Sequence, residues 1–210
     1  MKIVLITPSG KSDNELASVI QMFEAGLGTL HVRKNRFSTK ELDEYLDQIP
    51  KHFHNRIIIH SHHKLALKYD LKGIHFTSTH LKKTFRLWLN TKFIYLRKPR
   101  LIKTMSFRRA TDLYLPQSVK TNYCFLGTMF HNVSGELYSG FYREVVEATI
   151  QKSGAKIVAR GGISDKSIEL AHQLGFYGVA LYGHIWKSPS PYKTYVEFIN
   201  ACKEKNIPIE

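Results

Sequence analysis

The sequence predicts an α/β protein, a single-domain (β/α)8 (TIM) barrel over residues 1–210. Eight short apolar runs, rich in Ile, Val, Leu, Phe and Tyr, lack the alternation of polar and apolar side chains that marks a half-exposed sheet. Such runs are typical of parallel strands covered on both faces. Helical or helix-like segments separate them, and strict alternation implies right-handed crossovers and one parallel sheet. Eight such units favour closure into a barrel.

The expected strands are four to six residues long and consist mainly of β-branched, aliphatic and aromatic residues. They lie at residues 2–7, 29–33, 56–60, 73–76, 101–105, 123–126, 156–160 and 178–182. The alternative fold is an open doubly wound sheet. No GxGxxG turn follows the first run, where residues 7–10 (TPSG) predict an ordinary turn, and we therefore prefer the barrel.

The expected helices follow from apolar spacing and end signals. Residues 14–25 carry apolar side chains at helical spacing, and Ser38 with Glu41 has the spacing of a capping box at the start of a second helix. Further helical segments are expected at residues 81–95, which can also be read partly as strand, at 164–175, where Gly175 ends the helix, and at 191–205.

Charge is the unusual bulk property. The chain has 31 Lys and Arg against 17 Asp and Glu, a formal net charge of +14. A positive field concentrates anions such as nucleic acid, lipid headgroups or phosphorylated metabolites. The basic residues are spread along the chain without zinc-finger spacing or interleaved aromatic residues, so nucleic acid is not favoured as a partner. We expect a phosphorylated small-molecule substrate instead. The sequence leaves open whether the chain forms a homo-oligomer.

The location is predicted from apolar runs and cysteines. The first apolar run has four residues, too short for a signal-peptide core or a membrane span. The two cysteines lack CxxC spacing, which fits a reduced compartment. We therefore expect a cytoplasmic protein that does not associate with membranes.

Glycines end the last two expected strands. Gly161 and Gly162 follow the seventh run, and Gly183 follows the eighth. Barrel enzymes commonly bind phosphate at these two strand ends, through loop amides that glycine leaves accessible. Tight turning alone would also explain one glycine pair. Two glycine ends in successive units favour an anion site.

Several segments, in order along the chain, resemble the thiamine phosphate synthase/TenI family. The segment VARGGISDKSIELAHQLGFYGVAL (158–181) resembles the family's A-x-GGI turn and the strand that follows it. LHVRKN (30–35) resembles the end of its second strand, Q-x-R-x-K, and the other similar segments are IIIHSHHKLAL (57–67), KGIHFTSTHL (72–81) and YCFLGTMF (123–130). The resemblance spans nearly the whole chain.

The resemblance implies a reaction and some of its residues. The family's synthase joins a pyrimidine diphosphate to a thiazole phosphate and releases pyrophosphate, with help from Mg²⁺ and basic side chains. Departing pyrophosphate concentrates negative charge, which a hard cation and guanidinium groups neutralise. By this resemblance Arg33 binds an anion, and Gly161 and Gly162 hold the thiazole phosphate.

Departures from the family pattern affect the metal site. Near the end of the second strand, His31 replaces the family's glutamine and Asn35 replaces its lysine. Near the ends of the third and fourth strands, His60 and Ser61 replace an asparagine–aspartate pair, and His80 replaces a metal-binding aspartate. Histidine is a poor ligand for Mg²⁺. Mg²⁺ is therefore expected as a cofactor only if the synthase activity is retained.

TenI-type relatives tautomerise a thiazole phosphate with an acid/base histidine after the fifth strand. Here Ser106 matches that segment, but arginine stands where histidine is expected. The function classes that stay open are a synthase-like transferase, a metal-independent TenI-like tautomerase or another isomerase, and a non-catalytic basic protein that binds RNA or a protein partner.

Histidines gather at the expected strand ends. His31, His60 and His75 end the second to fourth runs, and His62, His63 and His80 follow closely. Neutral imidazole titrates near operating pH and suits acid/base work. The predicted catalytic residues are Arg33, His31, His60 and Ser106, and the predicted substrate-binding residues are Gly161, Gly162, Gly183, His75 and His131. His60, His62 and His80 are weaker candidates for a borderline metal ion; we prefer to interpret these histidines as hydrogen-bonding and surface residues.

Overall fold

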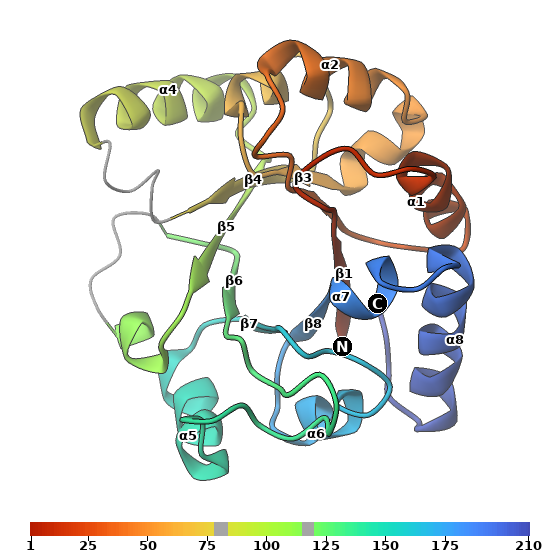
Figure 1. Ribbon diagram of the computed structural model, residues 1–210. Helices are drawn as coiled ribbons and strands as arrows, with labels where there is room; N and C mark the ends of the chain where they lie inside the picture. The colour runs from red at the N-terminus through yellow and green to blue at the C-terminus, as the bar shows by residue number, and fades with distance from the viewer. Residues whose placement is uncertain (78–83, 115–119) are drawn as a thin grey trace.

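The computed structural model describes residues 1–77, 84–114 and 120–210. Eight strands form one closed barrel in chain order, each parallel to the next, and the eighth pairs with the first. Figure 1, seen along the barrel, shows the helices arranged around the ring of strands. The (β/α)8 prediction is confirmed, and closure between the first and last strands rules out the open sheet.

The strands fall where the apolar runs predict them. They are β1 (Lys2–Ile6), β2 (Leu30–Val32), β3 (Ile57–Ile59), β4 (Gly73–Phe76), β5 (Ile102–Phe107), β6 (Tyr123–Leu126), β7 (Ile157–Arg160) and β8 (Gly178–Leu181). β5 differs most from the expectation, because it continues two residues beyond Met105. Its extension places Ser106 within the strand.

The connections between strands are mostly helical. The α-helices are α1 (Glu15–Glu24), α2 (Thr39–Asp47), α4 (Thr84–Arg97), α5 (Arg143–Ser153), α6 (Ile168–Gln173), α7 (Gly183–Trp186) and α8 (Pro191–Glu204). Short 3-10 helices are η1 (Lys51–Arg56), η2 (His63–Leu67) and η3 (Ala110–Tyr114). The ambiguous segment 81–95 is helical in its described part, from Thr84 onward. Among the described residues, no helix has the length and apolar character needed to cross a membrane.

Local sequence signals account for two helix ends. The Ser38 side chain accepts a hydrogen bond from the Glu41 amide at 3.2 Å, and the Glu41 carboxylate accepts one from the Ser38 amide at 2.8 Å, so the capping box is confirmed. α6 begins at Ile168, later than expected, because the amide of Ser164 donates to the Ser167 hydroxyl in a turn before the helix.

Two hydrophobic clusters form the core. The larger lies between the strands and the surrounding helices. The smaller occupies the barrel interior, because its members alternate along the strands with residues of the outer cluster. Its buried residues are Val4, Ile6, Ile58, Tyr123, Phe125, Val158 and Ala180. The apolar interior leaves polar side chains to collect at the carboxyl ends of the strands.

Candidate functional site

A cavity of about 1230 Å³ opens at the carboxyl ends of the strands. Its lining comes from both halves of the barrel, including Arg33 after β2, His75 on β4, Ser106 on β5 and Arg160 on β7. Barrel enzymes bind their substrates at this end, since the βα loops meet there. The cavity is therefore the candidate active site.

The charge of the lining is strongly positive. Its cationic residues are Arg33, Arg108, Arg109, Arg160 and Lys187. Its carboxylate is Asp112, which lies 3.5 Å from the Arg109 guanidinium. Within the described parts of the chain, Arg33, Arg108 and Arg160 form no ion pair with a carboxylate. Three guanidinium groups thus face one cavity with no carboxylate paired to them in the described chain.

Arg160, the last residue of β7, is held in place by neutral partners. Its guanidinium donates to the Ser106 hydroxyl at 3.3 Å and to the Gly127 carbonyl at 3.0 Å. Burial lowers the pKa of Arg160, and the charges of Arg33 and Arg108 lower it further. A bound anion would relieve this repulsion, because an arginine fork binds phosphate with charge-assisted hydrogen bonds.

The glycine turn after β7 has backbone angles that other residues rarely adopt. Gly161 has a φ of 87° and Gly162 a φ of 71°. A Cβ atom on Gly162 would lie 1.9 Å from the Phe130 carbonyl oxygen. The amides of Gly161, Gly162 and Gly183 donate no hydrogen bond to the described residues, and all three glycines line the cavity. These amides are donors available to an anion.

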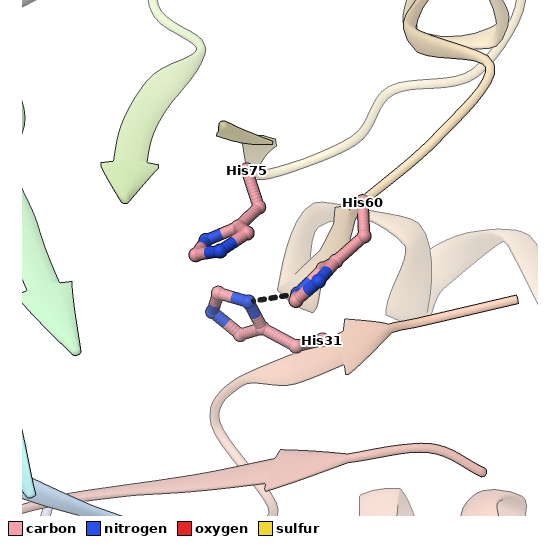
Figure 2. Close-up of side chains that lie close together, drawn as sticks. All are labelled: His31, His60 and His75. Atoms are coloured by element: carbon pink, nitrogen blue, oxygen red, sulfur yellow. Dashed lines mark hydrogen bonds between the residues drawn. The ribbon is translucent and has the colours of Figure 1, made fainter. Parts of the chain in front are cut away.

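Three buried histidines meet at the same end of the barrel as the arginines. His31 lies on β2, His60 directly follows β3 and His75 lies on β4, and all three are buried. Figure 2 shows the rings pointing toward one another, with Nδ1 of His31 2.9 Å from Nε2 of His60. The rings of His60 and His75 are stacked, with centroids 4.0 Å apart. Neighbouring parallel strands bring the three side chains together at one end of the barrel.

Hydrogen bonds connect the histidines to the barrel wall. His31 Nε2 lies 2.5 Å from the Tyr123 hydroxyl, and His75 contacts Thr104 at 2.8 Å and Ser106 at 3.0 Å. Burial holds the pKa of His31 well below its usual value. Burial does the same to the pKa of His60, and neighbouring histidines and Arg33 add to the effect. His31 and His60 are therefore neutral at physiological pH, with lone pairs available.

The structure places the predicted site residues as follows. The cavity is lined by Arg33, His60, His75, Ser106, Gly161, Gly162 and Gly183. His31 lies deeper, bonded to His60. His131 is exposed, with its ring 4.8 Å from that of Tyr138, and does not belong to the described lining. His62 faces α2, since its ring nitrogens lie 2.8 Å from the Thr39 hydroxyl and the Phe37 carbonyl. His80 lies outside the described residues.

Sequence reasoning missed Arg160, Thr104 and Tyr123 as site residues, and it noted Arg108 only as the arginine that stands where the tautomerase histidine is expected. Arg160 carried a usable signal, because it directly precedes the glycine pair at the end of a strand. Tyr123 and Thr104 carried none, because only the barrel shows that they face inward. Lys34, next to the position of the family's lysine, is buried and bonded to Glu15 on α1 at 2.6 Å, outside the described lining.

The donor groups at the cavity do not fit Mg²⁺. This ion prefers carboxylate, phosphate and water oxygens in an octahedral arrangement. The one carboxylate of the described lining, Asp112, is bonded to Arg109 through both the side chain and the backbone amide. The buried hydroxyl of Ser61 has no hydrogen-bond partner among the described residues, but it supplies one neutral oxygen. Imidazoles and guanidinium groups make up about half of the remaining polar side chains of the described lining, and the others are neutral hydroxyls and amides together with Lys187.

Comparison with solved structures shows the same fold in several enzymes. Thiamine phosphate pyrophosphorylase from Bacteroides thetaiotaomicron is 21% identical, with a TM-score of 0.73 over 97% of this chain and 96% of that one. Thiamine phosphate pyrophosphorylase from Pyrococcus furiosus is 17% identical, with a TM-score of 0.72 over 97% and 95%. Geranylgeranylglyceryl phosphate synthase from Thermoplasma acidophilum, solved with sn-glycerol-1-phosphate, is 16% identical, with a TM-score of 0.68 over 97% and 93%.

Comparison with sequences gives a family. No curated protein sequence matches this chain. The family model described as thiamine monophosphate synthase (TMP-TENI) matches residues 3–185, which include the strand ends that form the cavity. The chain therefore belongs to the thiamine monophosphate synthase family, as its sequence motifs predict.

Proposed function

We propose that this protein binds a phosphorylated thiazole at the mouth of its barrel and moves a proton on it, as TenI-type relatives do. The observation that carries the proposal is a group of three guanidiniums, those of Arg33, Arg108 and Arg160, which have no carboxylate partner in the described part of the chain and lie beside the amides of the glycine turn. A phosphate monoester supplies both the negative charge and the acceptor oxygens that such a surface binds. The concave shape favours a small molecule over nucleic acid.

Proton transfer is the chemistry that the lining supports best. Tautomerisation takes a proton from one ligand atom and returns one to another, with no change in charge or redox state. His60 and His75 line the cavity, and the hydroxyl of Ser106 lies between His75 and Arg160. A neutral imidazole can accept the proton, and the hydrogen-bonded hydroxyl orients the ring. The transferase reaction would instead need neutralisation of departing pyrophosphate, for which the described lining offers arginines but no group of carboxylates that suits Mg²⁺.

Binding and chemistry can be measured separately on metal-free protein. Isothermal titration in EDTA with thiazole phosphate should give one site per chain, and the tautomer ratio should change with time when followed by NMR. Arg160→Gln should weaken binding by about 10- to 150-fold, because a hydrogen bond to a charged group contributes about 1.5–3 kcal/mol. The matched control is Arg143→Gln, since the exposed Arg143 guanidinium pairs with Glu147 on the outer face of α5.

Three results would contradict the proposal. Absence of thiazole phosphate binding would remove its basis. Equal affinities in Arg160→Gln and Arg143→Gln would exclude the cavity as the binding site. Formation of thiamine phosphate from both precursors after addition of Mg²⁺ would show a synthase instead. A cytoplasmic location and a homo-oligomeric state stay predictions from the sequence.

A further inference from the structure

Three imidazoles converge inside the barrel from neighbouring strands (Figure 2). One ring nitrogen from each of His31, His60 and His75 lies within 4.8 Å of the other two. A tetrahedral Zn²⁺ ion with Zn–N bonds of about 2.0–2.1 Å separates its nitrogen ligands by about 3.3 Å. His31 Nδ1 and His60 Nε2 are 2.9 Å apart, about 0.4 Å below this value, and no pair of the three candidate ligand atoms exceeds it by more than about 1.5 Å.

The contact between His31 and His60 shows that the site contains a basic ring nitrogen. Metal ions bind the neutral form of imidazole through its lone pair. The 2.9 Å contact between His31 Nδ1 and His60 Nε2 requires one of the two nitrogens to accept the hydrogen bond through such a lone pair. The proton shared between His31 and His60 does not have to leave the site. It can lie on His31 Nε2, where it is donated to the Tyr123 oxygen, and this tautomer frees the Nδ1 atom.

The surroundings orient the rings as metal-binding histidines are usually oriented. Such histidines normally hold their second ring nitrogen in a hydrogen bond, which fixes both the tautomer and the ring plane. His31 Nε2 has Tyr123 as its partner at 2.5 Å, and His75 Nδ1 has Thr104 at 2.8 Å. Tyr123 lies on β6, across the barrel from β2, whereas Thr104 lies on β5 and is paired directly with His75 on the neighbouring β4. Both the opposite wall and the adjacent strand thus support the histidines.

The donor type and the exposure of the rings define the class of ion. Three nitrogen donors suit borderline ions such as Zn²⁺, Co²⁺ or Ni²⁺ and not Mg²⁺ or Ca²⁺. His60 and His75 line the cavity, so a bound ion would have an open position facing it, as in three-histidine catalytic sites. We infer that His31, His60 and His75 form a binding site for one borderline divalent transition-metal ion, with a coordination position open to the anion-binding cavity.

This inference goes beyond the proposed function and does not depend on it. An ion would occupy the lone pairs that proton transfer by His60 or His75 would use. The isomerase assay is therefore done in EDTA, whereas metal binding is measured without any substrate. Either result can fail while the other holds.

The experiment is a titration of tag-free, EDTA-treated protein with Co²⁺, followed by visible absorption. Co²⁺ in a tetrahedral nitrogen site gives intense d–d bands, whereas hydrated Co²⁺ gives weak ones. We expect one Co²⁺ per chain, displaced by one equivalent of Zn²⁺ and unaffected by excess Mg²⁺. His75→Asn should abolish the intense bands. The matched control is His172→Asn, which removes an exposed histidine on α6 and should leave them unchanged.

A second variant tests the support of the rings. Tyr123→Phe leaves all three candidate ligands and removes the hydroxyl that contacts His31. We expect its Co²⁺ affinity to fall about 10- to 100-fold, the usual effect of removing a partner that orients a metal ligand. Circular dichroism is used to check that each variant is folded. The inference is wrong if folded wild-type protein gives no intense bands, if His75→Asn retains them, or if His172→Asn removes them.

Discussion

Gly162 offers the sharpest test of the glycine turn. In Gly162→Ala the new Cβ would lie 1.9 Å from the Phe130 carbonyl oxygen, whereas real Cβ contacts essentially never fall below 3.0 Å. The turn or Phe130 must therefore move by at least 1.1 Å, the difference between these two distances. Phe130 is buried, and its amide donates to the Gly161 carbonyl at 3.1 Å, so neither part can move freely.

The expected loss of stability has two parts. A left-handed backbone angle in an alanine costs about 1–2 kcal/mol, and overpacking in a buried region costs about 1–3 kcal/mol more. Gly162→Ala should thus lower the free energy of unfolding by about 2–5 kcal/mol. Urea denaturation measures this loss as a lower midpoint with an unchanged m-value.

Two other glycines separate these contributions. Gly154 has a φ of 61°, and a Cβ added there would meet no atom within 4 Å, so Gly154→Ala should show the backbone cost alone, about 1–2 kcal/mol. Gly183 lacks a positive φ, and a Cβ there would have only the flexible Lys187 Cε near it, at 3.9 Å, so Gly183→Ala should be nearly neutral. A Gly162→Ala protein as stable as Gly154→Ala would refute the proposed clash with Phe130.

Three further predictions concern other parts of the fold. Ser38→Ala should lower the free energy of unfolding by about 0.5–2 kcal/mol in urea denaturation, because the α2 amide loses its cap; an unchanged midpoint would contradict this. Lys34→Met should lower the free energy of unfolding by about 3–5 kcal/mol, because it leaves the buried Glu15 carboxylate without its lysine partner. The double variant Lys34→Met/Glu15→Leu should recover most of this loss. Burial raises the pKa of Glu15 despite the opposing effect of Lys34. Glu15 therefore keeps its proton in the folded chain at pH values just above 4.5, where the unfolded chain releases it. The free energy of unfolding should consequently fall as the pH rises from 4.5 toward the higher pKa of the folded chain. This slope should be absent from Glu15→Gln when denaturation is repeated across that window.

The local elements were predictable because their signals are local. The apolar runs gave all eight strands within a few residues, and the Ser38 capping box gave the start of α2. The segment 81–95 was ambiguous, since its aromatic and aliphatic residues suit both helix and strand, and the structure shows a helix from Thr84. Strand length was the weaker prediction. β5 continues to Phe107 through pairing with β6, which no local signal announces.

The candidate site was predictable only in part. The carboxyl ends of parallel barrel strands all lie at one end of the barrel, whatever path the loops take. This is why Arg33, His60, His75 and the glycine turn line one cavity. His131 follows a strand in the same way, but its loop pairs with itself through Phe130 and Leu137 and leaves the ring exposed. A loop's path depends on its own contacts, which strand order does not determine.

The sequence by itself determined the barrel, the family and the positive charge, because strand periodicity, ordered motifs and composition can all be read along the chain. Only the tertiary structure decided which arginines of the described chain face the cavity without a carboxylate partner, and which histidine rings are in contact. Arg160 and Ser106 are 54 positions apart, and His31 and Tyr123 are 92 apart. Such contacts depend on closure of the barrel and on which face of each strand points inward, and both arise from the packing of the whole chain.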